Sequence, residues 1–193
     1  MEILKERIRK DGVVKAGNVL KVDSFLNHQM DISLLDEIGR EFRRRFSGRL
    51  ITKVLTIESS GIGVAYPVAR EFGVPLVFAK KSGSINLDGD MYVAEVESFT
   101  RQTTNKVIVS KKFLGPDDHV LIIDDFLANG EAAFGGIRLL TRAGASKVSV
   151  GAVIAKAFHP GMQKLRETGH RVEALAAVKR IADAHEMPLW FYY

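Results

Sequence analysis

The chain has 193 residues, a formal net charge of +5 and no cysteine, with 46% hydrophobic and 26% charged residues. This length and composition are typical of a single globular domain with enough chain to bury a core. The lack of cysteine excludes disulfides and thiolate metal sites. No apolar run approaches the length of a membrane span. Because residues 1–12 are charged and amphipathic, without the apolar segment of a signal peptide, we expect a cytoplasmic protein.

The positive net charge fits two classes of partner. Nucleic acid is one, but the basic residues are mostly spread along the chain, apart from arginines 43–45 and two lysine pairs. A substrate that carries a pyrophosphate group also requires positive potential. We therefore favour a small-molecule partner, with nucleic acid as the weaker alternative and no membrane partner.

The first part of the chain predicts two helices. Isoleucine and leucine alternate with charged residues at helical spacing over residues 2–10, which predicts a short amphipathic helix. Residues 13–21 predict extended or irregular backbone. Asp31 or Ser33 can cap a second helix that ends at about Phe46, with the three arginines in its last turn, where cations complement the helix dipole.

A strand, a small-residue loop and a helix then follow in sequence. Lys53–Ile57 is a β-branched run that predicts a buried strand, and residues 58–61 (ESSG) lead directly into an apolar helical pattern. Such a loop presents backbone N–H groups and the positive end of the helix dipole, which suits an anion. The alternative is a capped helix in which Gly63 permits close packing. A second unit of this kind occurs later, so we favour ligand binding by Ser59, Ser60 and Gly61.

Paired lysines and a β-ribbon come next. Residues 76–79 predict a strand, and Lys80 and Lys81 at its end can neutralise a diphosphate or simply be solvated. Residues 91–99 and 106–110 predict two strands that form a ribbon, joined by residues 100–105. Polar residues face one side of this ribbon, so we expect a lid rather than core.

The segment VLIIDDFLANGEA, residues 120–132, is the centre of the prediction. Four apolar residues predict a strand buried on both faces of a parallel sheet, with Asp124 and Asp125 at its carboxyl end, where such sheets bind ligands. The loop that follows precedes another helix and suits a phosphate. The two acids suit vicinal hydroxyls, or Mg²⁺ held through water. The alternative is an ordinary buried strand followed by a capped helix.

Another predicted strand, residues 147–154, ends near a cation and an aromatic residue. Phe158 can stack on a purine and Lys156 can meet a carbonyl oxygen; the alternative is a surface lysine beside a core phenylalanine. Strands and helices alternate through most of the chain, so we expect one α/β domain over residues 1–193 with a central, mostly parallel sheet flanked by helices. Residues 1–30 and a C-terminal segment are expected to form a small hood.

Residues 120–132 resemble the phosphoribosyl-pyrophosphate motif of the type I phosphoribosyltransferases. The resemblance implies that Asp124 and Asp125 act as catalytic residues that face the ribose 2- and 3-hydroxyls. It implies pyrophosphate contacts from Ser59, Ser60, Gly61, Lys80 and Lys81, near a strained peptide bond, and a flexible lid formed by the ribbon. The 5-phosphate would be held by Ala128, Asn129, Gly130, Glu131 and Ala132. Many members have threonine at positions 129 and 132, glycine at 131 and aspartate at 128.

Similarity to the family's xanthine-using members in bacteria extends over nearly the whole chain. It rests on residues 20–29, 57–61, 98–103 and 124–132 together with the Lys156 and Phe158 pair. The implied reaction transfers the phosphoribosyl group of 5-phosphoribosyl 1-pyrophosphate to xanthine, with Mg²⁺ held mainly by the substrate, in a homodimer. The implied xanthine contacts are Leu20, Asn27, Lys156 and Phe158.

Two alternatives share the same domain. A guanine or hypoxanthine enzyme is one, since a few contacts decide preference for exocyclic groups. A purine-operon repressor that senses phosphoribosyl pyrophosphate without catalysis is the other. Such repressors carry an added DNA-binding module at the N-terminus, and the twenty or so residues before the expected base site are too few for one.

Overall fold

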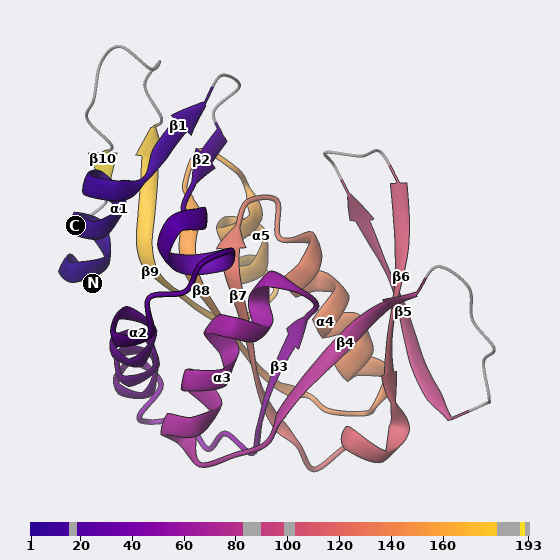
Figure 1. Ribbon diagram of the computed structural model, residues 1–193. Helices are drawn as coiled ribbons and strands as arrows, with labels where there is room; N and C mark the ends of the chain where they lie inside the picture. The colour runs from indigo at the N-terminus through magenta and orange to yellow at the C-terminus, as the bar shows by residue number, and fades with distance from the viewer. Residues whose placement is uncertain (16–18, 83–89, 99–102, 181–189, 192–193) are drawn as a thin grey trace.

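The computed structural model describes residues 1–15, 19–82, 90–98, 103–180 and 190–191. Its centre is one eight-stranded sheet (Figure 1), with strand order β10-β9-β8-β7-β3-β4-β6-β5. The strands of this sheet are β3 (Lys53–Ile57), β4 (Leu76–Ser82), β5 (Met91–Ser98), β6 (Thr103–Ser110), β7 (His119–Leu127), β8 (Lys147–Lys156), β9 (Arg171–Arg180) and β10 (Trp190–Phe191). The five from β9 to β4 run parallel, and antiparallel strands complete both edges.

Helices cover both faces of this sheet (Figure 1), as expected of an α/β fold. They are α1 (Glu2–Asp11), α2 (Ile32–Arg45), α3 (Ser60–Phe72), α4 (Glu131–Arg142) and α5 (Gly161–Glu167). Side-chain alternation along β7 divides the core in two. Leu121 and Ile123 pack with α1, α2 and α3, whereas Val120 and Ile122 pack with α4 and α5. The predicted fold class, a mostly parallel sheet flanked by helices, is confirmed.

Helix α2 forms for the reasons that its sequence indicates. The carboxylate of Asp31 accepts a hydrogen bond from the N–H of Leu34, so Asp31 is the cap, and Ile38 and Phe42 are fully buried on one face. The arginines of the last turn are structural: Arg44 and Arg45 both pair with Glu41.

The N-terminal residues lie over one end of the sheet. The ammonium group of Met1 donates to the carbonyl of Leu175 at 2.7 Å, which fixes α1 against β9. Residues predicted as extended form an antiparallel hairpin of β1 (Val13–Lys15) and β2 (Val19–Lys21). A single π-helical turn, η1 (Asp23–Asn27), connects it to α2. The role of this segment as a hood stays a prediction, as does the expected single domain over residues 1–193.

Two groups of charged residues lie inside strands rather than after them, contrary to the prediction. Strand β7 continues to Leu127, so Asp124 and Asp125 belong to it, because β8 pairs with it as far as Ala155. Lys80 and Lys81 lie within β4, since β6 extends that strand by antiparallel pairing.

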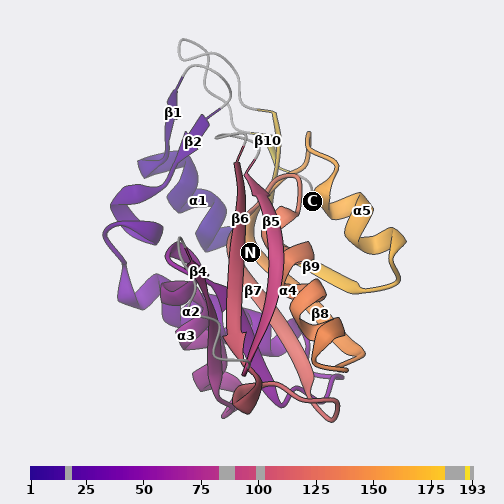
Figure 2. The ribbon, with the colours of Figure 1, turned by 90° about the vertical axis from the view of Figure 1, so that its right-hand side faces the viewer.

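The β-ribbon also differs from its prediction. Its second strand begins at Thr103, earlier than expected, and Figure 2 shows β5 and β6 side by side along the length of the molecule. Ala94, Val107 and Val109 are buried in the core beside α4, so this part of the ribbon is not a lid. Residues 99–102, which include part of the predicted connection of the ribbon, lie outside the described residues, as do residues 83–89 and most of the C-terminal segment that was expected in the hood.

In the described part of the chain, no helix has the length and apolar character needed to cross a membrane.

Candidate active site

Asp125 connects three separate parts of the chain. The residue is 5% exposed, and its carboxylate accepts one hydrogen bond from the amide Nδ2 of Asn27 at 2.8 Å and another from the Oγ of Ser60 at 3.2 Å. The first donor belongs to the π-helical turn η1 and the second to the first turn of α3. Two donors hold this carboxylate in one orientation, at the edge of the sheet where parallel strands bind ligands.

Asp124 faces the other side of β7, because side chains alternate along a strand. Its Oδ1 accepts a hydrogen bond from the N–H of Asp125 at 3.0 Å. Burial, and then the neighbouring charge of Asp125, raise the pKa of the Asp124 carboxyl well above its ordinary value, while Lys81 acts in the opposite direction. A hydroxyl donor or a cation that reached Asp124 would stabilise the ionised form of its carboxyl group.

The first turn of α3 depends on glycine. A Cβ at Gly61 would lie 2.2 Å from the Oγ1 of Thr56, so no larger residue fits without a shift. The Glu58–Ser59 peptide bond is cis, within the segment where the resemblance implied a strained bond. Glu58 accepts a hydrogen bond from the main-chain N–H of Lys81 and so ties the loop to β4.

Four of the five predicted pyrophosphate residues, all except Lys80, are connected with this loop. Ser59, Ser60 and Gly61 stand at the N-terminus of α3, and the main chain of Lys81 contacts the loop. Lys80 and Lys81 are consecutive in β4, so their side chains leave opposite faces of the strand. The charge of Lys81 acts to lower the pKa of Asp124.

A cavity of about 370 Å³ lies on the Asp124 side of the sheet edge. It is lined by Asp124, Phe126, Leu127, all of the residues 128–133, Lys156 and His159. The five predicted phosphate-loop residues are thus brought together with the end of β8. Gly130 has a φ of 88°, a left-handed conformation that glycine adopts at little cost, and α4 begins at the next residue.

The four predicted base-site residues are placed differently from one another. Lys156 lines the cavity, and burial lowers the pKa of its ammonium group. The ring of Phe158, 39% exposed, packs on His159 and is not among the lining residues. The side chain of Leu20 is buried in the core, and Asn27 is bonded to Asp125.

Sequence reasoning missed one contact between predicted residues and one residue of the cavity wall. The contact between Ser60 and Asp125 had no signal, since it joins residues 65 positions apart. His159 had one: it follows Lys156 by three residues, just beyond the end of a strand that was already assigned to the ligand edge. In the structure its ring lies in the cavity wall, and burial together with Lys156 lowers its pKa.

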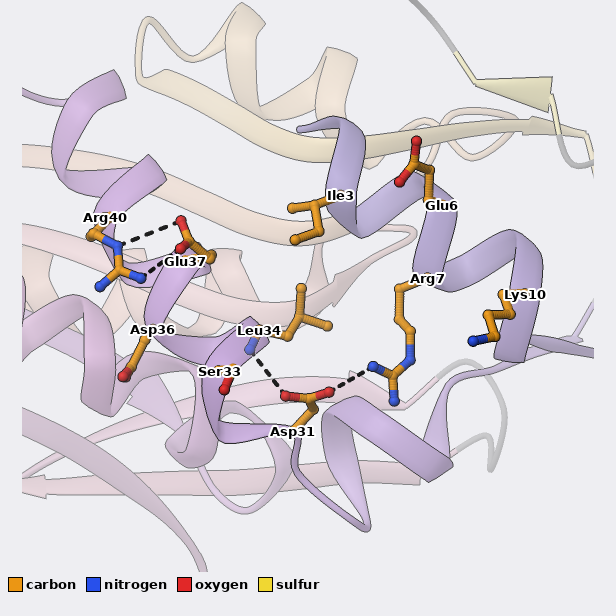
Figure 3. A pocket seen from close by; sticks show the side chains of 10 residues that line it. All are labelled: Ile3, Glu6, Arg7, Lys10, Asp31, Ser33, Leu34, Asp36, Glu37 and Arg40. Carbon is orange, nitrogen blue, oxygen red and sulfur yellow. Dashed lines mark hydrogen bonds and ion pairs between the residues drawn. The ribbon is translucent and has the colours of Figure 1, made fainter.

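A larger cavity of about 600 Å³ lies between α1 and α2 (Figure 3). Its wall is largely neutralised from within, because Arg7 pairs with Asp31 and Arg40 with Glu37. None of the predicted site residues lines it. We therefore assign ligand binding to the sheet edge, where two carboxylates, a partly buried lysine and two helix N-termini converge.

The donor set at this edge is compatible with magnesium. Over the described ranges, no three His, Cys, Asp or Glu side chains come together as a metal site. Mg²⁺ commonly takes only one or two carboxylates and completes its shell with water and substrate phosphates. Asp124 and Asp125 can supply these carboxylate oxygens, so the residues present fit a magnesium ion that arrives with a phosphorylated substrate.

Comparison with known proteins identifies the family. Residues 22–165 match the model of the phosphoribosyl transferase domain. The chain belongs to the phosphoribosyltransferase family. The resemblance and the enzyme class inferred from the sequence are thereby confirmed. The matched segment contains both loops, both acids and Lys156.

Curated relatives place the chain more narrowly. It is 60% identical to the xanthine phosphoribosyltransferase of Lachnoclostridium phytofermentans, over 92% of this chain and 92% of the relative. It is 54% identical to that of Bacillus cytotoxicus, over 95% and 93% of the two chains. Xanthine phosphoribosyltransferase 1 of Clostridium perfringens is 53% identical, over 95% and 97%.

Solved structures support the same fold. The adenine phosphoribosyltransferase of Giardia lamblia superposes with a TM-score of 0.78, over 92% of this chain and 98% of the other, at 23% identity. That of Rhodothermus marinus gives a TM-score of 0.72, over 92% and 100%, at 22% identity. At such identities the likeness speaks for the phosphoribosyltransferase fold and not for the base that is used.

Proposed function

We propose that this chain transfers the phosphoribosyl group of 5-phosphoribosyl 1-pyrophosphate to xanthine, forming xanthosine 5′-monophosphate and pyrophosphate in purine salvage. The observation that carries this proposal is the shared cavity of Asp124, the loop of residues 128–132 and Lys156. One cavity thus offers a group for the sugar, a cradle for the 5-phosphate and a donor for a purine carbonyl. The names of the curated relatives, at 52–60% identity, support xanthine as the base.

The two acids suit the sugar. In the reaction the bond from ribose C1 to the pyrophosphate oxygen breaks, and a bond from C1 to a xanthine nitrogen forms while xanthine gives up one proton to the solvent. Positive charge develops on the ribose ring as the pyrophosphate leaves. Asp125, fixed by Asn27 and Ser60, would accept a hydrogen bond from a ribose hydroxyl. Asp124 would accept from the neighbouring hydroxyl, and both negative groups would stabilise the developing positive charge.

The loop before α3 suits the leaving pyrophosphate. Main-chain N–H groups at the N-terminus of α3, including that of Ser60, would bind its oxygens together with the hydroxyl of Ser59 and the ammonium group of Lys81. The hydroxyl of Ser60 is occupied by Asp125, and Lys80, on the opposite face of β4, would add positive potential without a direct contact. Mg²⁺, when bound with the substrate near Asp124 and Asp125, would neutralise charge that builds on the leaving oxygens. The ribbon β5–β6 is the element that we expect to carry a lid at its tip and to limit hydrolysis.

Lys156 suits a 6-oxopurine. Its ammonium group is partly desolvated, so a carbonyl oxygen of the base would replace water as its acceptor, whereas the amino group of adenine offers no acceptor at that position.

The other three predicted base-site residues would need different arrangements. Asn27 can reach the base only by sharing its amide between Asp125 and the purine. Leu20 would act through its main chain, because its side chain is buried, and Phe158 would stack after a rotation of its exposed ring.

The decisive experiment measures pyrophosphate release with phosphoribosyl pyrophosphate and Mg²⁺, offering xanthine, guanine, hypoxanthine and adenine separately. We expect release with xanthine to exceed that with each other base by at least tenfold in kcat/KM. Faster release with guanine or hypoxanthine would show that xanthine is not the preferred base, while the proposed mechanism would still apply. Tight phosphoribosyl-pyrophosphate binding without release from any base would indicate a sensor instead.

We further propose a homodimer and a cytoplasmic location, as family resemblance and composition suggest. Light scattering at working concentration tests the first, and a monomer there would contradict it.

A further inference from the structure

The side chains of His159 and Asn129 define each other's orientation. The Nδ1 of His159 lies 3.0 Å from the Oδ1 of Asn129, in a partly buried contact. An amide oxygen can only accept a hydrogen bond, so the ring nitrogen must be the donor and carries the proton. Burial and the nearby Lys156 lower the pKa of His159, which favours the neutral ring with its proton on Nδ1.

This contact has a consequence for the amide of Asn129. Because its oxygen is engaged by His159, the amide cannot rotate by half a turn without losing that hydrogen bond. Its nitrogen Nδ2, with two N–H donors, is therefore fixed at the opposite end of the group. Asn129 and His159 both line the cavity that holds the phosphate loop. The amide can thus offer donors to an anion there, beside the main-chain N–H groups.

The main chain of the same segment is held from the same side. The N–H of Gly161 donates to the carbonyl of Ala128 at 3.0 Å. A Cβ at Gly161 would lie 2.2 Å from that carbonyl oxygen and 2.7 Å from the nitrogen of Gly130. The segment that follows β8 therefore contacts the loop at consecutive residues, once through main chain and once through the His159 ring.

We propose that His159 is a positioning residue for the 5-phosphate, which orients the amide of Asn129 so that its Nδ2 donates to a phosphate oxygen. This inference rests on the proposed function, because it assigns a role within the same phosphate loop. It explains how a loop with alanine at position 132 and asparagine at position 129, instead of hydroxyl residues, retains a side-chain donor for phosphate.

Three substitutions of His159 separate this role from a general structural one. The Nδ2 of asparagine occupies nearly the place of the ring Nδ1, so His159→Asn keeps the donor. His159→Gln places its amide nitrogen near the ring Nε2, and His159→Ala removes both nitrogen positions.

The expected results differ among the three variants. In His159→Ala we expect the Kd of ribose 5-phosphate, measured by calorimetry, and the KM of phosphoribosyl pyrophosphate to rise about tenfold. His159→Asn is expected within about threefold of wild type and His159→Gln to lie nearer His159→Ala. The KM for xanthine and kcat should change less than twofold.

A second background tests whether His159 acts through Asn129. Asn129→Thr supplies a hydroxyl that needs no orientation by the ring, so His159→Ala should then have little further effect on ribose 5-phosphate binding. Equal affinity of wild type and His159→Ala would overturn the proposal, as would the same tenfold loss in both backgrounds. If wild type bound neither ribose 5-phosphate nor phosphoribosyl pyrophosphate, the proposed function itself would fail, which is a distinguishable result.

Discussion

Asn27 donates a hydrogen bond to Asp125 at 2.8 Å, across 98 positions of the chain. The π-helical turn that carries Asn27 thereby holds one of the two acids of the β7 edge. Resemblance implied that this asparagine meets the base. The contact observed indicates that it also sets the orientation of a carboxylate assigned to the sugar, so recognition of base and sugar would be coupled through one amide.

Substitution of Asp125 tests the sugar role directly. Asp125→Asn keeps the size of the side chain, but removes the charge and leaves Asn27 and Ser60 facing an amide. We expect kcat/KM to fall at least about 100-fold, equivalent to about 2.7 kcal/mol of transition-state stabilisation. Steady-state pyrophosphate release checks this value.

A matched control lies just before the same strand. Asp118 is hydrogen-bonded to Lys53 and Thr52, so Asp118→Asn should lower the free energy of unfolding and leave kcat unchanged. Equal turnover of wild type and Asp125→Asn would remove Asp125 from the chemistry.

The base-site role of Lys156 is tested against a lysine at the other end of β8. Lys156→Ala should raise the KM for xanthine roughly tenfold or more, because hydrogen bonds to a charged donor contribute about 1.5–3 kcal/mol. The Kd of phosphoribosyl pyrophosphate should change much less. Lys147→Ala, at the exposed first position of the strand, should alter neither constant. An equal loss of affinity for xanthine and for phosphoribosyl pyrophosphate in Lys156→Ala would refute the base-site role of Lys156.

Much of the fold follows from local sequence pattern. The apolar runs at 53–57 and 120–123 become adjacent parallel strands, and a helix follows each predicted small-residue loop, beginning within it at Ser60 and at Glu131. Strand ends were less predictable, because length depends on the neighbour. Asp124 would end an isolated apolar run, yet it pairs with Ala152 because β8 extends equally far.

The site was predictable only as far as it is local. Each loop and its following helix are contiguous in sequence, so a candidate anion site at residues 128–132 could be predicted from its own residues, and its role as the 5-phosphate loop stays a prediction. The contacts that orient the functional groups are not local. Asn27 reaches Asp125, Ser60 reaches the same carboxylate and His159 reaches Asn129 only after the sheet has brought distant segments together.

Because Gly161 packs closely against the phosphate loop, we expect its substitution to weaken substrate binding although Gly161 has no proposed contact with the substrate. Gly161→Ala would force its Cβ against the Ala128 carbonyl, so the loop or α5 must shift. We expect the KM of phosphoribosyl pyrophosphate to rise about tenfold and stability to fall by about 1–3 kcal/mol. Gly48→Ala, where nothing lies within 4 Å, is the control and should change neither value. Unchanged substrate binding in Gly161→Ala would show that the loop tolerates displacement.

Glu41 gives a pH-dependent prediction away from the site. Hydrogen bonds from Arg44, and then from Arg45, lower the pKa of Glu41 from 4.5 to about 2. A carboxylate with a lowered pKa in the folded state stabilises the fold fully above its unfolded pKa. That stabilisation is lost as the pH falls from 4.5 towards 2. Glu41→Gln should therefore lower the free energy of unfolding by about 1 kcal/mol at neutral pH, because Arg44 is largely exposed and its pairing is screened.

Urea unfolding at pH 7 and at pH 3 measures this difference. The gap between wild type and Glu41→Gln should shrink at the lower pH, because at pH 3 the unfolded chain binds a proton at Glu41 that the folded state, with a pKa of about 2, mostly does not. Glu37→Gln on the same helix is the control: its pair with Arg40 is about half exposed on both sides, so we expect a change within about 0.5 kcal/mol at either pH. A gap for Glu41→Gln that is the same at both pH values would mean that the packing of Glu41, and not its charge, supports the last turn of α2.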